Sequence, residues 1–227
     1  ESLYGYLPPR LRESAKVYSH FRDLCLALEQ KTEITRDQVL FLGAGDLWKW
    51  AHAFSAWQSA CGVKQDAFGH FLKGRISSQS KLVENAPLGS MTTMGVGGDA
   101  KWYCEPANTE DLTTLLEACE FFELPRSMLG RGSNLIVPDQ GFGGLVIRLR
   151  GEYWKTIDLR SEDTLLVGAG AKLKEICKFA CKNNLKGFEF LEGIPGTLGG
   201  ALRMNAGAMG WEIFDMVEWV KFLMPDG

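Results

Sequence analysis

The sequence predicts a fold of mixed helices and strands, of the α+β or α/β class, and two observations favour this class. Short apolar runs that are typical of strands alternate with stretches whose apolar residues recur at helical spacing. Glycine occurs in clusters, and each cluster lies where a predicted strand ends or before a predicted helix. Of the 227 residues, 45% are hydrophobic and 23% are charged, which suffices for one or two domains with cores of their own.

The first 60 residues read as one small unit. Residues 39–42 form a short apolar run, the turn Gly-Ala-Gly-Asp follows at 43–46, and apolar residues at helical spacing resume over 47–54. Asp46 has the position of a helix cap rather than of a catalyst. We therefore expect a strand–turn–helix unit of the α/β type over residues 1–60, followed by a linker over 61–90 that contains one short helix.

The elements of the third segment, residues 91–227, follow in order along the chain. Asn108 has the position of an N-cap, and the helix after it should bury Leu112, Leu115, Leu116 and Cys119. A second amphipathic helix should bury Leu173, Ile176, Cys177 and Ala180. The predicted strands are 101–105, 145–149, 156–159, 165–167 and a long one at 213–224. The turn signal Pro-Asp-Gly at 225–227 then calls for a further strand.

Charge and composition limit the classes of partner. The net charge is −3 and the sequence pI is about 5.7, so no basic surplus indicates nucleic acid. No apolar run approaches the roughly 18 residues that span a bilayer, and no signal-peptide pattern is present, so we expect no membrane partner and a cytoplasmic location. Neither the cysteines nor the histidines have the spacing of metal ligands, so we expect no metal site. We expect ordinary surface or core roles for His20, His52 and His70. We also expect reduced thiols at all six cysteines: Cys25, Cys61, Cys104, Cys119, Cys177 and Cys181.

The glycine clusters carry the strongest chemical signal. They lie at 95–98, 130–132, 141–144, 168–170 and 193–200. Exposed backbone N–H groups at the end of a strand or the start of a helix can cradle an anion, so several clusters favour a long ligand or one with more than one phosphate. The alternative is that each cluster serves only a tight turn. No P-loop and no complete dinucleotide fingerprint is present, and no Ser/His/Asp or Cys/His constellation indicates a nucleophile.

Four motifs appear in a fixed order: Thr-Thr-Met-Gly-Val-Gly-Gly at 92–98, Gly-Arg-Gly-Ser-Asn-Leu at 130–135, Gly-Ile-Pro-Gly-Thr-Leu-Gly-Gly at 193–200, and Met-Asn-Ala-Gly-Ala at 204–208. In this respect the chain resembles the UDP-N-acetylenolpyruvoylglucosamine reductase family from about residue 68 onward. The resemblance implies an FAD-binding domain of two α+β subdomains. It also implies that NADPH reduces the flavin, which then reduces the enolpyruvyl group of a UDP-sugar to UDP-N-acetylmuramate for peptidoglycan.

The resemblance also implies which residues bind FAD. One wall of the site would consist of Gly130, Arg131, Gly132, Ser133, Asn134 and Leu135. A second wall would consist of Ile194, Pro195, Gly196, Thr197, Gly199 and Gly200, continued by Asn205, Ala206 and Gly207. Further candidates are Thr93, Gly97 and Gly98. Many family members have tyrosine where this chain has Met209, so a hydroxyl contact at that position is absent here.

The family's catalytic arginine, serine and glutamate would follow Gly227, so we assign no catalytic residue and expect the 227-residue chain alone not to turn over NADPH. An inactive flavin-binding fragment is therefore one alternative. Residues 39–47 carry a second resemblance, to the C-terminal end of UDP-N-acetylmuramate–L-alanine ligases. That resemblance implies a covalently fused, ATP-dependent ligase domain, and hence a bifunctional polypeptide as the other alternative.

Overall fold

A computed structural model describes residues 64–224 of the chain. The chain divides into two units, one ending at Arg75 and one beginning at Ile76. The strand–turn–helix expected over 39–54, with Asp46, lies outside the described residues. In the first unit the described element is helix α4 (Lys64–Leu72), which is the short helix predicted for this stretch. The Arg75 guanidinium closes its end, because Nη1 donates to the Phe71 carbonyl at 2.6 Å and the group stacks 4.3 Å from the Phe71 ring.

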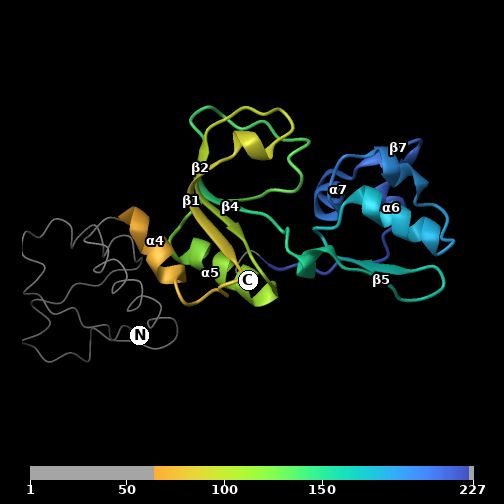
Figure 1. Cartoon of the computed structure of the whole chain (residues 1–227), viewed down its shortest axis with the longest axis horizontal. Helices are drawn as coiled ribbons and strands as arrows, with labels where there is room; N and C mark the ends of the chain where they lie inside the picture. The colour runs from red at the N-terminus through yellow and green to blue at the C-terminus, as the bar shows by residue number, and fades with distance from the viewer. Residues whose placement is uncertain (1–63, 225–227) are drawn as a thin grey trace, which may run out of the picture. The chain divides into compact units, whose positions relative to one another are not determined.

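The second unit begins with a mixed sheet of four strands (Figure 1). The strands lie in the order β1–β2–β4–β3, and only β1 is antiparallel to its neighbour. Their bounds are β1 (Lys81–Pro87), β2 (Asp99–Glu105), β3 (Arg126–Met128) and β4 (Phe142–Ile147). Since β2, β4 and β3 run parallel, their carboxyl ends meet at one edge of the sheet, where ligands bind in open sheets of this kind.

Strand β1 corrects the expectation of a linker that runs to residue 90. Residues 81–87 pair with β2, from Lys81 opposite Glu105 to Pro87 opposite Asp99. The segment Lys-Leu-Val-Glu-Asn-Ala-Pro contains proline, lysine and a left-handed Asn85 with a φ of 52°. These features are tolerated at the edge of a sheet, where one side of the strand needs no hydrogen-bonding partner.

Helix α5 (Thr109–Phe121) confirms the helix predicted after Asn108. The Asn108 side chain accepts a hydrogen bond from the backbone N–H of Asp111 at 2.8 Å, as an N-cap does. The four apolar side chains predicted to face the core are buried: Leu112, Leu115, Leu116 and Cys119.

Among residues 76–224 two apolar clusters lie in different parts of the second unit. The first belongs to the sheet and contains Tyr103, Leu129, Val137 and Val146. The second is built around Leu173, Ile176, Phe190, Leu191 and Ile213. The elements around it are η4 (Glu152–Lys155), β5 (Ile157–Leu159), β6 (Leu165–Val167), α6 (Leu173–Lys182), η5 (Glu189–Gly193), α7 (Leu198–Met204), β7 (Gly207–Ala208), β8 (Trp211–Glu212) and η6 (Ile213–Asp215). Both parts combine helices with strands, so the α+β class is confirmed.

The long strand expected over 213–224 is wrong. Residues 213–215 form the short helix η6, and residues 216–224 belong to no helix or strand. Their apolar content suggested a strand, but β8 ends at Glu212 and pairs with β7, and 216–224 pairs with no strand in the described part. Without a partner a strand leaves its backbone groups unpaired, and here Phe222 remains 74% exposed.

The described cysteines differ strongly in their environment. Cys104 on β2 and Cys119 on α5 are buried, and burial raises the pKa of each thiol to about 12. Cys181 on α6 is exposed, whereas Cys25 and Cys61 lie outside the described residues. Of the described cysteines, we expect iodoacetamide at pH 8 to alkylate the exposed Cys181 before Cys104 and Cys119, because a shift from 9.0 to about 12 leaves roughly a thousandfold less thiolate at the two buried positions. Peptide mass spectrometry measures the labelling.

Labelling in urea is the control, since all three thiols should then react alike; equal native labelling of Cys104 and Cys181 would contradict the burial. The pH dependence follows from the same shift. An unfolded thiol ionises near pH 9.0, and the buried thiols ionise only near 12. The free energy of unfolding should therefore be unaffected by these thiols below about pH 9 and should fall as the pH rises towards 12.

Candidate functional site

The Gly-Arg-Gly-Ser-Asn loop lies at the carboxyl edge of the sheet. It follows β3 directly, and the last residue of β3, Met128, pairs with Ile147 of β4. The backbone N–H of Leu129 donates to the Ile147 carbonyl at 2.8 Å, which holds the start of the loop against the neighbouring strand. Residues 130–134 thus leave the sheet where a bound ligand can meet their backbone.

Gly132 ties this loop to the first motif. It has a φ of 77°, and a Cβ at this position would overlap the Met91 carbonyl and lie 2.9 Å from the Thr92 Cα. Its own carbonyl accepts a hydrogen bond from the backbone N–H of Thr93 at 2.9 Å. Only glycine can occupy this position, because any side chain would clash with the neighbouring backbone. The loop and the segment that contains Thr93 therefore pack backbone against backbone.

Gly97 and Gly98, unlike Thr93, do not contact the loop at 130–134 but pack against residues 137–139. The backbone N–H of Gly98 donates to the Pro138 carbonyl at 2.9 Å, and a Cβ on Gly97 would lie 2.6 Å from the Val137 carbonyl oxygen. Their contacts are therefore with residues 137–139. Of the three further candidates from the first motif, the structure brings only Thr93 to the loop at 130–134.

The two predicted walls of the site meet. The Ser133 hydroxyl donates a hydrogen bond to the Pro195 carbonyl, which joins the loop after β3 to the second glycine-rich segment. A Cβ on Gly130 would lie 2.8 Å from Thr197 Oγ1 and 4.0 Å from the Gly200 Cα. The absence of a side chain at Gly130 therefore allows the two segments to approach each other closely.

The second wall is held by a segment that the sequence motifs did not single out for this role, residues 169–173. The backbone N–H groups of Leu198 and Gly199 donate to the carbonyls of Ala171 and Ala169 at 2.9 and 2.8 Å. Lys172 also forms an isolated antiparallel bridge with Thr197. The glycine cluster at 168–170 allows this arrangement, because a Cβ on Gly170 would lie 3.1 Å from the Trp154 carbonyl oxygen. The clue in the sequence was that cluster, which we interpreted as a possible anion cradle or a tight turn and not as a support for the second wall.

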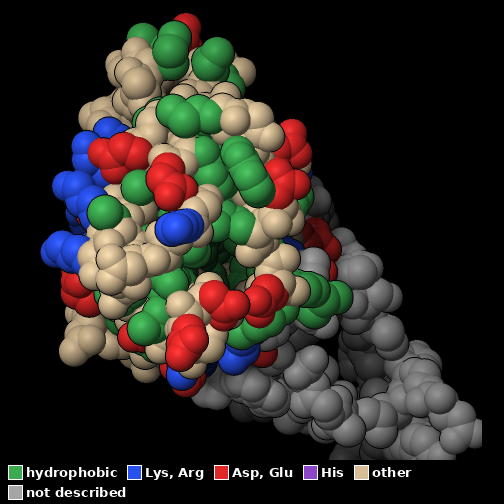
Figure 2. All heavy atoms as spheres, turned by 90° about the vertical axis from the view of Figure 1, so that its right-hand side faces the viewer, with side chains coloured by type: hydrophobic (Ala, Val, Ile, Leu, Met, Phe, Trp, Pro, Cys, Tyr) green, Lys and Arg blue, Asp and Glu red, His purple; other side chains and the backbone are tan. Residues whose placement is uncertain are grey.

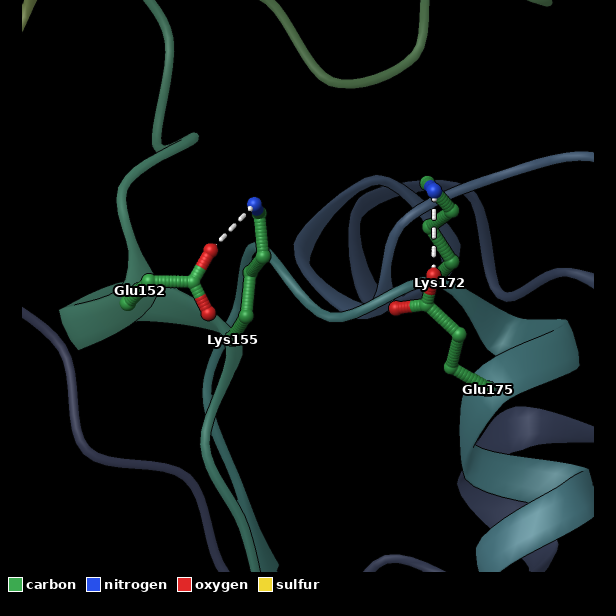
Figure 3. A network of polar contacts seen from close by, with 4 residues as sticks. All are labelled: Glu152, Lys155, Lys172 and Glu175. Atoms are coloured by element: carbon green, nitrogen blue, oxygen red, sulfur yellow. Dashed lines mark hydrogen bonds and ion pairs between the residues drawn. The ribbon is translucent and has the colours of Figure 1, made fainter.

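Two ion pairs lie beside this supporting segment (Figure 3). Lys172 Nζ is 3.0 Å from Glu175 Oε1, and Lys155 Nζ is 3.0 Å from Glu152 Oε1. The hydrogen bond from Lys172 lowers the pKa of the Glu175 carboxyl, and the charge of Lys155 contributes to the same shift. Because each cation has its own carboxylate, these four side chains add no net charge to the second wall.

Asn205 has a structural role within its own hairpin. It ends α7 in the left-handed conformation, with a φ of 44°. Its amide nitrogen donates to Glu212, and its amide oxygen accepts from the backbone N–H of Phe214 at 3.3 Å. Gly207 pairs with Glu212 in the two-stranded ladder of β7 and β8. The side chain of Asn205 therefore shapes the chain after α7, and Met209 at the tip of this hairpin is 84% exposed.

Several residues of the predicted site have exposed side chains. In the first wall these are Arg131, Asn134 and Leu135. Large hydrophobic side chains near the second wall are also exposed, namely Met204, Met209, Trp211 and Phe214. Figure 2 shows one face of the molecule on which hydrophobic side chains gather between acidic and basic ones. Both walls thus offer polar and apolar groups to a ligand that has both kinds of surface.

Two further features of the described part concern metals and membranes. Among residues 64–224 no group of three or more histidine, cysteine, aspartate or glutamate side chains has an arrangement that could hold a metal ion. None of the helices within that range combines the length and the apolar character needed to cross a bilayer.

Comparison with known proteins agrees with the glycine-rich geometry. A family model described as an FAD binding domain matches residues 100–227. A UDP-N-acetylenolpyruvoylglucosamine reductase of Legionella pneumophila (strain Corby) is 45% identical over 150 residues, which cover 66% of this chain and 48% of the relative. The protein of the same name from Desulfosudis oleivorans is 42% identical over 146 residues, covering 62% and 46%.

Among solved structures, UDP-N-acetylenolpyruvylglucosamine reductase from Thermus caldophilus matches with a TM-score of 0.48 and 39% identity. The match covers 59% of this chain and 45% of that one. The chain spans about half the length of the relatives it matches.

Proposed function

Because the chain belongs to the family of FAD binding domains, we propose that residues 130–135 and 194–200 bind the diphosphate and the flavin of FAD between them. The observation that carries this proposal is the meeting of the two segments through Ser133 and Pro195. The residues fit the group, since the loop follows the end of β3, contains glycine at 130 and 132 where a Cβ would clash, and can offer backbone N–H groups to a ligand. Phosphate oxygens accept hydrogen bonds from such groups.

The residues of the site would have distinct tasks. Gly130 and Gly132 bring the backbone close to the diphosphate, and Asn134 adds an amide side chain as a donor. Pro195 stiffens the second segment, which lies close to Gly130. Ala206 and Gly207 extend that segment, with Asn205 fixing their conformation through Glu212. When bound, FAD supplies the hydride-transfer chemistry, and the chain supplies binding and orientation.

For the whole reaction we propose reduction of UDP-N-acetylglucosamine enolpyruvate to UDP-N-acetylmuramate in peptidoglycan synthesis, with NADPH as the reductant. The support is the shared name of the relatives that are 42–45% identical to this chain. We place the reaction in the cytoplasm, and the four described cysteines, which are free thiols, agree with a reducing compartment. No catalytic residue is assigned within the chain.

Titration of the 227-residue chain with FAD tests the proposal. We expect saturable binding, seen as a change in flavin fluorescence and in the yellow absorption band, and a rise in the thermal midpoint as FAD is added. NADPH with the enolpyruvyl substrate should give no turnover by this chain alone. Absence of flavin binding would refute the proposed site, and measurable turnover would show that residues of this chain carry the reaction.

A second candidate function concerns residues 39–47, which lie outside the described residues. We propose that they are the end of an ATP-dependent UDP-N-acetylmuramate–L-alanine ligase fused to the FAD-binding part. The Gly-Ala-Gly-Asp motif supports this proposal. Sequencing the parent reading frame tests it: a P-loop motif upstream would support a bifunctional protein, and an upstream sequence without one would refute a ligase.

A further inference from the structure

A polar network lies at the carboxyl edge of the sheet, outside the glycine-rich motifs. The Tyr103 hydroxyl donates to Glu105 Oε1 at 2.5 Å, and Arg150 Nη1 is 3.7 Å from the same oxygen. Burial and the bond to Glu105 raise the pKa of Tyr103 far above its ordinary value of 10.0, while the nearby positive charge of Arg148 opposes the rise. The neutral Tyr103 hydroxyl therefore bonds to one carboxylate and lies under the influence of one guanidinium.

The strand register places this network beside the loop after β3. Arg148 follows Ile147, which pairs with both Cys104 of β2 and Met128 of β3. The backbone N–H of Arg148 donates to the Cys104 carbonyl at 2.9 Å, so Arg148 continues the line of β4 between its two neighbours. The loop at 130–134 begins two residues after Met128. Arg148 thus leaves the sheet next to the first wall of the FAD site.

The charges at this edge do not cancel. Glu105 is the one carboxylate of the network, and its two cations are Arg150, 3.7 Å from Glu105 Oε1, and Arg148, which acts on Tyr103. Arg131, in the neighbouring loop, adds an exposed positive charge. An arginine held in place by a neutral tyrosine still has several N–H donors in a rigid planar fork, which suits the oxygens of a phosphate.

We propose that Arg148, positioned by Tyr103 and Glu105, binds the phosphate groups of the flavin cofactor at the carboxyl edge of the sheet. This inference rests on the proposed function and adds a cation to a site otherwise built from backbone N–H groups. It assigns Tyr103 and Glu105 as positioning residues, since they act through Arg148.

Flavins that differ in their phosphates test the proposal in the 227-residue chain. Affinities for FAD, FMN and riboflavin are measured by flavin fluorescence for the unchanged chain, Arg148→Met and Tyr103→Phe. For Arg148→Met we expect about a tenfold loss of affinity for FAD and FMN, and no change for riboflavin, which has no phosphate. For Tyr103→Phe we expect a smaller loss with the same pattern. Arg126→Met is the matched control, because Arg126 begins β3, pairs with Leu145 of β4 and lies 3.5 Å from Glu120.

Each outcome separates the proposal from its alternatives. An equal loss for all three flavins would show a purely structural role for Arg148 and overturn the inference. Unchanged FAD affinity in Arg148→Met would overturn it while leaving the proposed function intact, whereas no flavin binding by the unchanged chain overturns both. If Arg148→Met does not fold, Arg148→Lys decides: it keeps the charge but loses the planar fork, so a weaker loss for FAD and FMN alone is expected, and no loss overturns the inference.

Discussion

Replacing Gly132 by alanine should abolish measurable FAD binding and lower the free energy of unfolding by about 2–4 kcal/mol. Gly132 has a φ of 77°, which disfavours any residue with a Cβ. The new methyl group would also overlap the Met91 carbonyl, which is backbone and cannot rotate away. The loop must then move from the segment that contains Thr93, and the first wall loses its shape. Urea unfolding and FAD titration measure the two effects.

Gly143→Ala is the matched control for this experiment. Gly143 lies in β4, its φ is not in the left-handed range, and a Cβ there would meet no atom within 4 Å. We expect a change in unfolding free energy within about 0.5 kcal/mol and unchanged FAD affinity. Equal losses in the two variants would contradict the role assigned to Gly132.

Replacing Asp111 by alanine should lower the free energy of unfolding by about 3 kcal/mol. The Asp111 side chain is buried near the start of α5, and its two oxygens accept from the Ser77 backbone N–H at 2.9 Å and from the Ser80 hydroxyl at 2.6 Å. The same hydroxyl accepts from the Ala107 backbone N–H at 2.8 Å. Alanine leaves the Ser77 N–H and the Ser80 hydroxyl without their acceptor, and an unsatisfied buried donor costs more free energy than the bond itself contributes. The midpoint of urea unfolding reports the loss.

Two variants separate this network from general effects on the helix. Glu110→Ala removes the neighbouring exposed carboxylate and should change the unfolding free energy by less than about 0.5 kcal/mol. Asp111→Asn keeps one acceptor oxygen, so its loss should be intermediate. A loss for Glu110→Ala as large as that for Asp111→Ala would show that the charge at the start of α5, and not the buried network, is responsible.

Signals in the local sequence predicted the helices and strands that are stabilised mainly by neighbouring residues in the chain. Helix α5 has an N-cap at Asn108 and apolar residues at helical spacing, and both features stabilise the helix wherever it lies. Strand β1 has no such signal, because its conformation depends on hydrogen bonds to β2. The segment 216–224 is the converse case, since its composition favoured a strand for which the described part supplies no partner.

In the candidate site, too, the sequence predicted features with local signals but not those that depend on tertiary contacts. The motifs identified which glycine-rich segments belong to it, but their contacts are tertiary and follow from no periodicity. That Thr93 reaches Gly132 while Gly98 reaches Pro138 depends on the path of the chain before β2. The network of Tyr103, Glu105 and Arg148 requires the register between β2 and β4, which local sequence does not encode.

The bond between Ser133 and Pro195 joins residues that are 62 positions apart, and each belongs to a part with its own apolar cluster. Closing so long a loop costs chain entropy before any contact offsets it. The contact between the walls therefore contributes to stability only when both parts are folded around their clusters. A ligand that binds both walls would therefore stabilise the junction of the two parts, because it binds only while both walls are in place.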